Sequence, residues 1–328
     1  MRLFDNAHYD FLRVRRYAYM ITATVAVVGL ATLAVRGLNE SIEFTGGALI
    51  QVHATDSTIT IGNVRSALDR GGIGSAELST FGTGQDFLIR ARLSLSAGAQ
   101  ADADSTAKAV STALAASLGA DNFDVQRVEA IGPRVGRELR TKALMAILLS
   151  FGVTLLYLTF RFEWRFAVAA ILATMHDIVL TVAFVSLMNL EITLVVIAAM
   201  LTIVGYSLND TIIVFDRVRE NLHKYKRSNI YEILNQSVNE TLPRTVLTAG
   251  TTLAATLSLL IFAGEVIRGF AWVMAFGLVT GTFSSIYIAS PVLLWIERKW
   301  PGEDVRGTRS LSKPPQQRQP APASARGD

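Results

Sequence analysis

Long apolar segments decide what this 328-residue chain can fold into. Hydrophobic residues make up 51% of the chain and charged residues 18%, a balance typical of multi-span membrane proteins rather than of soluble domains. A helix needs about 20 mostly apolar residues to cross the hydrocarbon core of a bilayer. Stretches near or above that length predict a polytopic α-helical membrane protein with six transmembrane helices, at residues 18–37, 143–160, 166–189, 191–215, 245–263 and 269–296.

The basic residues that flank these spans predict the orientation of the chain in the membrane. Arginine and lysine collect before the first span, between the second and third, between the fourth and fifth, and after the sixth. The positive-inside rule places these loops and both termini in the cytoplasm. We therefore expect four parts: a cytoplasmic N-terminus with the first span (1–37), an extracytoplasmic domain (38–142), a five-helix membrane domain (143–300) and a disordered cytoplasmic tail (301–328).

The extracytoplasmic segment has the element order of a ferredoxin-like α+β domain. Alternating and helical patterns predict the order β-α-β-β-α-β, the split βαβ arrangement. The segment lacks a cluster of His, Asp and Glu at metal-ligand spacing, and the chain has no cysteine. We expect neither a metal nor catalysis here, and docking onto a polypeptide is the more natural use. The predicted strands are 42–52, 76–81, 87–93 and 123–131, and the helices are 61–70 and 99–118.

Ionisable residues inside the spans are the candidates for function. Asp210 lies within the apolar run of the fourth span, where a carboxylate costs roughly 2.5–3.5 kcal/mol unless it is paired, protonated or hydrated. Arg244 opens the fifth span on the same side of the membrane, so it either approaches Asp210 or extends to the membrane surface. His176 and Asp177 lie near the middle of the third span. They suit a proton relay and a polar contact between helices equally well.

Hydroxyl and small residues mark two further helix faces. The spacing of the threonines after Arg244 places four hydroxyls on one face, which suits a polar interior seam or hydrogen bonds to the helix's own backbone. Small residues in the sixth span form a ridge for close helix packing. The threonines are Thr245, Thr248, Thr252 and Thr256, bordered by Thr251, and the ridge is Gly277, Gly281 and Ser285.

Several short motifs resemble the SecF family of protein-export membrane subunits. Their order and their placement on six spans make the match specific, and it covers about residues 1–300. Two departures, Ala249 in place of a common serine and Ala263 in place of a common glycine, do not touch the charged pair. The motifs are Phe44-Thr45-Gly46-Gly47, 132–136, His176-Asp177, 205–220, Asn239-Glu240, Pro243-Arg244-Thr245 and 281–285.

The resemblance implies a function in protein export. Members of this family are half-units related to the resistance-nodulation-division (RND) transporters, and they work in the bacterial cytoplasmic membrane with the six-span protein SecD. The family uses the proton-motive force to help draw preproteins from the SecYEG channel after the SecA ATPase has pushed them in. The resemblance implies no enzymatic activity and no cofactor, with the proton as coupling ion.

Individual residues take roles from the same resemblance. Asp210 and Arg244 match the positions of the family's proton-conducting centre, to which SecD adds a further aspartate. Polar residues around this pair are expected to support proton conduction. They are His176, Asp177, Asn209, Thr245, Thr248 and Thr252.

Three other interpretations of the sequence stay open. A scaffold that merely stabilises the translocon would tolerate neutral residues at Asp210 and Arg244. An RND-type exporter of small molecules would need twice as many spans and a larger outer domain. An intramembrane aspartyl protease would need Asp177 and Asp210 at one depth, whereas their depths differ by roughly 8 Å at 1.5 Å per residue.

Overall fold

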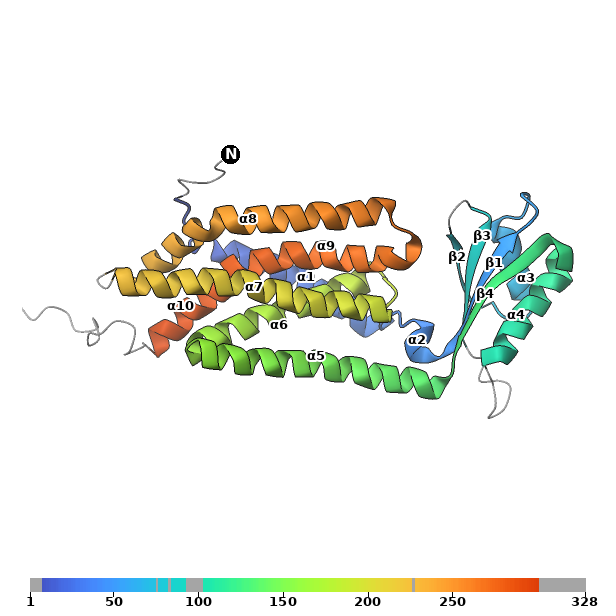
Figure 1. Ribbon diagram of the computed structural model, residues 1–328, viewed down its shortest axis with the longest axis horizontal. Helices are drawn as coiled ribbons and strands as arrows, with labels where there is room; N and C mark the ends of the chain where they lie inside the picture. The colour runs from blue at the N-terminus through green and yellow to red at the C-terminus, as the bar shows by residue number, and fades with distance from the viewer. Residues whose placement is uncertain (1–7, 75, 82–83, 93–102, 226–227, 301–328) are drawn as a thin grey trace, which may run out of the picture.

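A helical bundle and a small α/β domain lie end to end along the long axis of the molecule (Figure 1). The structure is a computed structural model, and it describes residues 8–74, 76–81, 84–92, 103–225 and 228–300, so the predicted tail at 301–328 lies outside the described residues. Within these ranges six helical segments are long and apolar enough to cross a membrane, which confirms the predicted fold class. The helices are α1 (Arg15–Arg36), α5 (Pro133–Arg161), α6 (Trp164–Leu187), α7 (Leu194–Lys224), α8 (Ile230–Phe262) and α9 (Glu265–Ser284), which continues through a π-helical turn (Ser285–Ala289) into α10 (Ser290–Lys299).

Two helices begin well before the spans that hydropathy predicts. α5 starts at Pro133, directly after the sheet, where proline suits the first helical turn. α8 starts at Ile230, so Pro243, which we expected near the start of a helix, lies inside one. The extra turns form because they bury Leu234 and Val238 in the main hydrophobic core of the bundle. α8 bends along its length (Figure 1). The bend is expected because Pro243, inside the helix, removes one backbone hydrogen bond.

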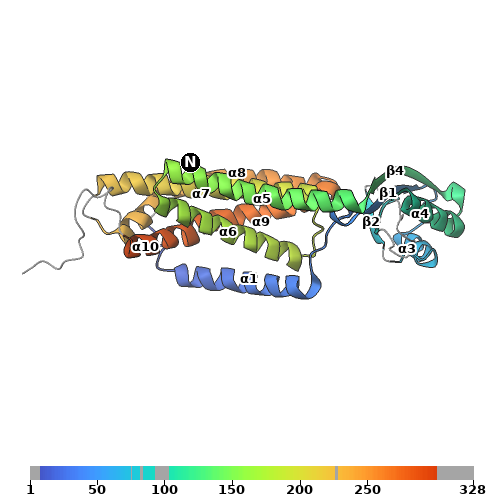
Figure 2. The same ribbon diagram turned by 90° about the horizontal axis from the view of Figure 1, so that it is seen from below.

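The outer domain has the predicted ferredoxin-like order of elements. Its antiparallel sheet has the strand order β2-β3-β1-β4. Two helices pack on one face of the sheet (Figure 2). The apolar core between the helices and the sheet includes Ile50, Phe87 and Leu114. The elements are β1 (Gly47–Ala54), α3 (Ile61–Arg70), β2 (Glu77–Phe81), β3 (Asp86–Arg92), α4 (Ala103–Leu118), a short 3-10 helix (Ala120–Asn122) and β4 (Phe123–Ile131). The predicted helix start at residues 99–102 lies outside the described residues.

The first strand starts later than the sequence pattern predicts. Residues predicted as the start of a strand at 42–45 form a short helix, α2 (Ile42–Thr45). The chain leaves α2 through Gly46, whose φ of 79° favours glycine. Tertiary contacts explain the difference: Phe44 is buried among residues of the membrane helices and not in the sheet. The motif at 44–47 therefore forms the joint between the two parts.

Contacts at this joint connect the outer domain to the start of α7. Ile192 forms backbone hydrogen bonds with Asn39 and Ser41, at 2.7 and 3.0 Å. Glu191 forms an ion pair of 3.1 Å with Arg90 on β3. The carboxylate of Glu43 also accepts a hydrogen bond from the first backbone amide of α7. A movement of α7 along its axis would therefore pull directly on the outer domain.

The segment before α1 is fastened to the early turns of α8. Asn239 exchanges two hydrogen bonds with the backbone of Tyr9, at 2.9 and 2.8 Å. The carboxylate of Asp10 accepts hydrogen bonds from Tyr231 and Asn235, at 2.6 and 2.9 Å. The Tyr231 hydroxyl is the main reason why the pKa of Asp10 lies below its usual value. Residues 9 and 10, which precede α1, thus connect the first span to α8 at the end of the bundle far from the outer domain.

Small residues set the closest approaches between the membrane helices. A Cβ atom at Gly277 would lie 2.1 Å from Cδ1 of Ile203, and one at Gly281 would lie 3.1 Å from Cβ of Ser207. The predicted small-residue ridge therefore packs α9 against α7. Gly29 of α1 does the same against α6, because a Cβ there would lie 2.7 Å from Cα of Ala183. These positions have no room for a larger side chain.

Replacing Gly29 by valine should push α1 away from α6. Overpacking of this kind costs roughly 1–3 kcal/mol, so Gly29→Val should lower the thermal unfolding temperature of the protein in detergent. Gly152→Val on α5 is the matched control, because in the described part of the chain nothing lies within 4 Å of a Cβ at Gly152. Equal effects of the two variants would contradict this packing.

Replacing Asp10 by asparagine should loosen the N-terminal segment at neutral pH. A carboxyl whose pKa is lowered in the folded state stabilises that state above its usual pKa of about 3.9, and this contribution disappears at lower pH. Asp10→Asn should cost about 1 kcal/mol or less at pH 7, because the site is exposed. The difference from the native protein in thermal unfolding should shrink as the pH falls below about 3.9 and vanish below the lowered pKa of Asp10. A difference independent of pH would rule out this contribution of the carboxylate.

Candidate functional site

A buried carboxylate joins three membrane helices near the middle of the bundle. Asp177 on α6 is 0% exposed. Its Oδ2 accepts hydrogen bonds from the hydroxyls of Ser207 on α7 and Ser284 on α9, each at 2.6 Å. Its Oδ1 lies 3.1 Å from Nδ1 of the half-buried His176. The two serine contacts are what a role in helix packing requires, and the histidine contact provides a neighbour for proton exchange.

The second buried carboxylate, Asp210, lies one turn beyond Ser207 on α7. It is 1% exposed, although only half of the most apolar stretch of α7 is buried. The hydroxyl of Thr282 on α9 faces it. Even so, Oδ2 of Asp210 has no hydrogen-bond partner within the described part of the chain. Asp210 and Asp177 therefore differ: Asp177 is bound by neighbouring hydroxyls, and Asp210 is left with unused acceptor capacity.

Other buried polar atoms near Asp210 share this lack of a partner. They come from three helices of the bundle and from the residues on either side of the carboxylate along α7. Buried polar groups in folded proteins are almost always hydrogen-bonded, to protein or to water. Such atoms can take partners from water or from a neighbouring protein. In addition to Asp210 Oδ2, the atoms without a partner in the described ranges include Tyr206 Oη, Thr211 Oγ1, Thr245 Oγ1, Thr282 Oγ1 and His176 Nε2.

The candidate base, Arg244, lies on α8 beside Asp210 but does not touch it. The two charges are near enough to interact electrostatically. Among the described residues, however, no ion pair within 4 Å includes Arg244. The arginine side chain is exposed in this single chain. A charged group exposed at this depth is costly unless water or another protein covers it.

The threonine face of α8 combines the two predicted possibilities. Thr245 and Thr256 are buried, and Thr248 and Thr252 are half-buried, so this face turns toward the bundle. The hydroxyls of Thr252 and Thr256 nevertheless donate to backbone oxygens one turn back in the same helix, each at 2.9 Å. On this face of α8, the buried Thr245 hydroxyl has no hydrogen-bond partner within the described chain. Asn209, the neighbour of Asp210 along the chain, is exposed.

Sequence reasoning missed the two serines that bind Asp177 and a network at the end of α7. Ser207 and Ser284 lie within the two glycine-containing motifs, but serine is too common in membrane helices to mark a partner. In the network, Glu240 accepts hydrogen bonds from Arg217 at 2.6 Å and from Asn221 at 2.7 Å. These contacts connect α7 to α8 beyond Asp210.

Family comparisons match most of the chain. The family described as protein export membrane protein SecD/SecF, C-terminal, matches residues 110–299. The SecD/SecF GG motif matches residues 31–58, which include the α2 joint. In the described part of the chain no group of three or more His, Asp or Glu side chains could hold a metal ion.

Named relatives and solved structures agree with these matches. Protein translocase subunit SecF of Gemmatimonas aurantiaca is 51% identical over 94% of this chain and 93% of its own length. The same subunit of Desulfurispirillum indicum is 42% identical over 87% and 90%. Among solved structures, the crystal structure of SecDF, a translocon-associated membrane protein from Thermus thermophilus, is similar with a TM-score of 0.77 and 36% sequence identity. The match covers 91% of this chain and 40% of the longer SecDF chain. The chain belongs to the SecD/SecF family of protein-export membrane proteins, and within it to the SecF group.

Proposed function

We propose that this protein is the SecF-type subunit of a Sec translocase in the bacterial cytoplasmic membrane, and that with a SecD-type partner it uses the proton-motive force to promote preprotein export. Its SecF relatives and the SecDF structure support the role in translocation and the partnership with SecD. SecYEG, the preprotein and, indirectly, SecA are the further partners of this proposal. Its role is transport rather than catalysis, with the proton as coupling ion and no cofactor.

The orientation belongs to the same proposal. The start of α1 and the end of α10 both lie toward the end of the bundle far from the outer domain (Figure 1). The basic loops at that end support a cytoplasmic location for both termini. Residues 38–142 then lie outside, where an emerging preprotein would meet them.

The observation that carries this proposal is the unsatisfied carboxylate of Asp210. A buried carboxyl with free acceptor capacity can gain a proton at little structural cost, because Oδ2 of Asp210 accepts no hydrogen bond from the described chain that would have to break. Arg244 on the neighbouring α8 is the cation that would stabilise the ionised form in this proposal. Each proton that crosses the membrane releases about 2.3 kcal/mol per 100 mV of potential. That is enough to shift an equilibrium between two helix packings by more than tenfold.

A continuous helix leads from Asp210 to the outer domain. α7 carries Asp210, then Ser207 with its bond to Asp177, and its outer end begins at Leu194. Just before that end, Ile192 and Glu191 contact the outer domain. A change of charge at Asp210 that alters the packing of α7 would therefore be transmitted along one rigid element. Movement of the outer domain would then favour forward movement of the exported chain.

Neutralising Asp210 should abolish the part of export that depends on the proton gradient. Asp210→Asn should reduce this part at least tenfold in membrane vesicles that carry equal amounts of the protein, and leave the ATP-driven part in place. Arg244→Lys, which keeps the charge but not the planar donors, should retain more activity than Arg244→Gln. Asp216→Asn on the exposed end of α7 is the matched control and should export normally. Normal gradient-dependent export by Asp210→Asn would favour a scaffold role instead.

The two buried aspartates should differ in what they contribute to stability. Asp177→Asn places an NH2 group either at the Oδ2 position, which accepts both serine hydroxyls, or at the Oδ1 position, which faces His176 Nδ1. It should therefore destabilise the bundle by about 1–3 kcal/mol. Asp210→Asn keeps one oxygen that can face the Thr282 hydroxyl, and the Oδ2 position accepts no hydrogen bond within the described chain, so this variant should leave thermal unfolding in detergent nearly unchanged. The reverse order of stabilities would refute this division between a packing carboxylate and a titrating one.

A further inference from the structure

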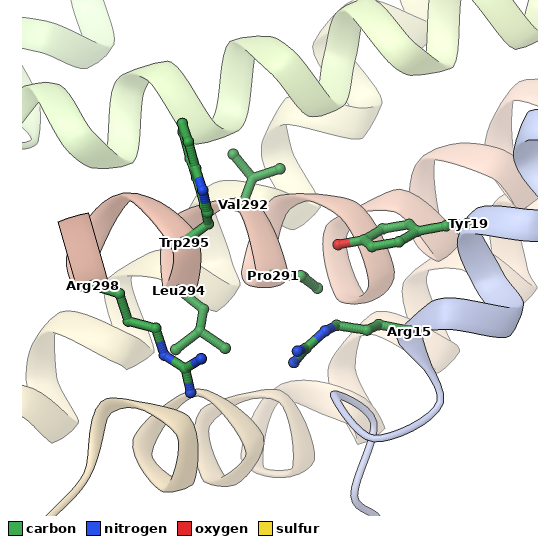
Figure 3. Close-up of a pocket in the computed structure, with 7 residues that line it drawn as sticks. All are labelled: Arg15, Tyr19, Pro291, Val292, Leu294, Trp295 and Arg298. Carbon is green, nitrogen blue, oxygen red and sulfur yellow. The ribbon is translucent and has the colours of Figure 1, made fainter.

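A cavity outside the proposed proton path opens between α1 and α10. Its volume is about 330 Å³, and both polar and apolar side chains line it. Arg15 and Tyr19 reach it from α1, and Arg298 reaches it from the last turn of α10 (Figure 3). Pro291 and Leu294 of α10 form an apolar wall. The cavity therefore combines two cations with a surface that suits hydrocarbon.

Among the described residues, no carboxylate is paired with either arginine of the cavity. Figure 3 shows their guanidinium groups turned toward the same space from opposite sides. Neither Arg15 nor Arg298 forms an ion pair with a carboxylate in the ranges that the structure describes. The neighbouring Glu297 is already paired with Arg165, at 2.8 Å. Two cations that face one cavity repel each other, so an anion bound between them would be stabilised by both.

Aromatic residues place the cavity at the level of the lipid headgroups. Three of the chain's four tryptophans lie at this end of the bundle. The Trp300 ring lies 6.2 Å from that of Trp164 and 5.8 Å from that of Trp295, which itself lines the cavity. Lys299 lies over the same rings. Tryptophan and basic residues gather where hydrocarbon meets the headgroup region of a bilayer.

We propose that this cavity binds the phosphate of an anionic phospholipid in the leaflet at the end of the bundle far from the outer domain. The guanidinium groups of Arg15 and Arg298 would donate to its phosphate oxygens, an arrangement for which arginine is better suited than lysine. Tyr19 would donate a further hydrogen bond from its hydroxyl. The acyl chains would run along the apolar face of α1, where Met20 and Ile21 are 57% and 61% exposed.

The depth and the apolar wall favour a lipid over other anions. A soluble phosphate would gain nothing from Pro291 and Leu294, and an acidic peptide would have to enter the plane of the membrane. Basic pockets between membrane helices commonly bind the headgroups of anionic lipids. A lipid held here would connect α1 to α10 at the side where the N-terminal segment is fastened to α8.

The test uses the full chain copurified with its SecD-type partner and counts bound lipid by native mass spectrometry. Phosphatidylglycerol and phosphatidylcholine, supplied at equal concentration, distinguish an anionic from a neutral headgroup, and sn-glycerol 3-phosphate serves as a soluble competitor. The native protein should prefer phosphatidylglycerol on the order of tenfold. Arg15→Gln with Arg298→Gln should abolish this preference, and the double lysine variant should keep part of it.

A matched control removes two basic residues from the same membrane face but not from the cavity. Arg16→Gln with Arg161→Gln should keep the preference, since neither residue lines the cavity. Loss of preference in this control would show diffuse surface charge and overturn the proposal, as would an unchanged preference in the double glutamine variant. Displacement of the lipid by millimolar glycerol phosphate would assign the site to soluble phosphates.

Two further results separate lipid binding from loss of structure and from protein docking. If the double glutamine variant unfolds at a lower temperature than the native protein, the single Arg298→Gln variant on the exposed end of α10 replaces it. That variant should still lower the preference several-fold. If a glutamine variant loses its SecD-type partner but binds lipid as the native protein does, the cavity binds protein and not lipid.

Discussion

The hydrogen bonds that Asp177 accepts from Ser207 and Ser284 are the interaction on which the rest of the membrane domain depends. A carboxylate in an apolar bundle is costly, and here two hydroxyls from two other helices offset that cost. They fix how α6, α7 and α9 are rotated against one another, and the glycine contacts of α9 with α7 become close as a result. Asp210 then has a defined position, one turn along α7 from Ser207.

The two buried aspartates therefore differ in role: Asp177 packs helices together, and Asp210 is the group proposed to titrate. Asp177 has partners on neighbouring helices, whereas Asp210 and several polar atoms around it have none within the described chain. Arg244 is exposed on the adjacent helix and not in contact with Asp210. These features agree with a site that a second subunit completes, as the likeness to part of a longer SecDF chain also suggests. The contacts at Ile192 and Glu191 give α7 a direct connection to the outer domain.

Sequence periodicity predicted the six spans and the β-α-β-β-α-β order because each depends on local pattern. It failed where tertiary contacts outweighed pattern: residues 42–45 form a helix because Phe44 is buried among membrane helices, and α8 continues through Pro243 because its early turns bury Leu234. Of the candidate site, Asp177 and Asp210 could be found as charges in apolar runs. The serine partners could not, because they depend on how neighbouring helices are rotated.

The most direct measurement follows the outer domain while Asp210 is titrated. The chain has no cysteine, so Lys108→Cys on α4 and Phe262→Cys at the end of α8 can carry spin labels without background. The distance between them in lipid bilayers would be measured at acid and alkaline pH by pulsed electron resonance. The account predicts a shift in the distance distribution for the native protein and none for Asp210→Asn. The same shift in both proteins, or no shift in the native one, would contradict it.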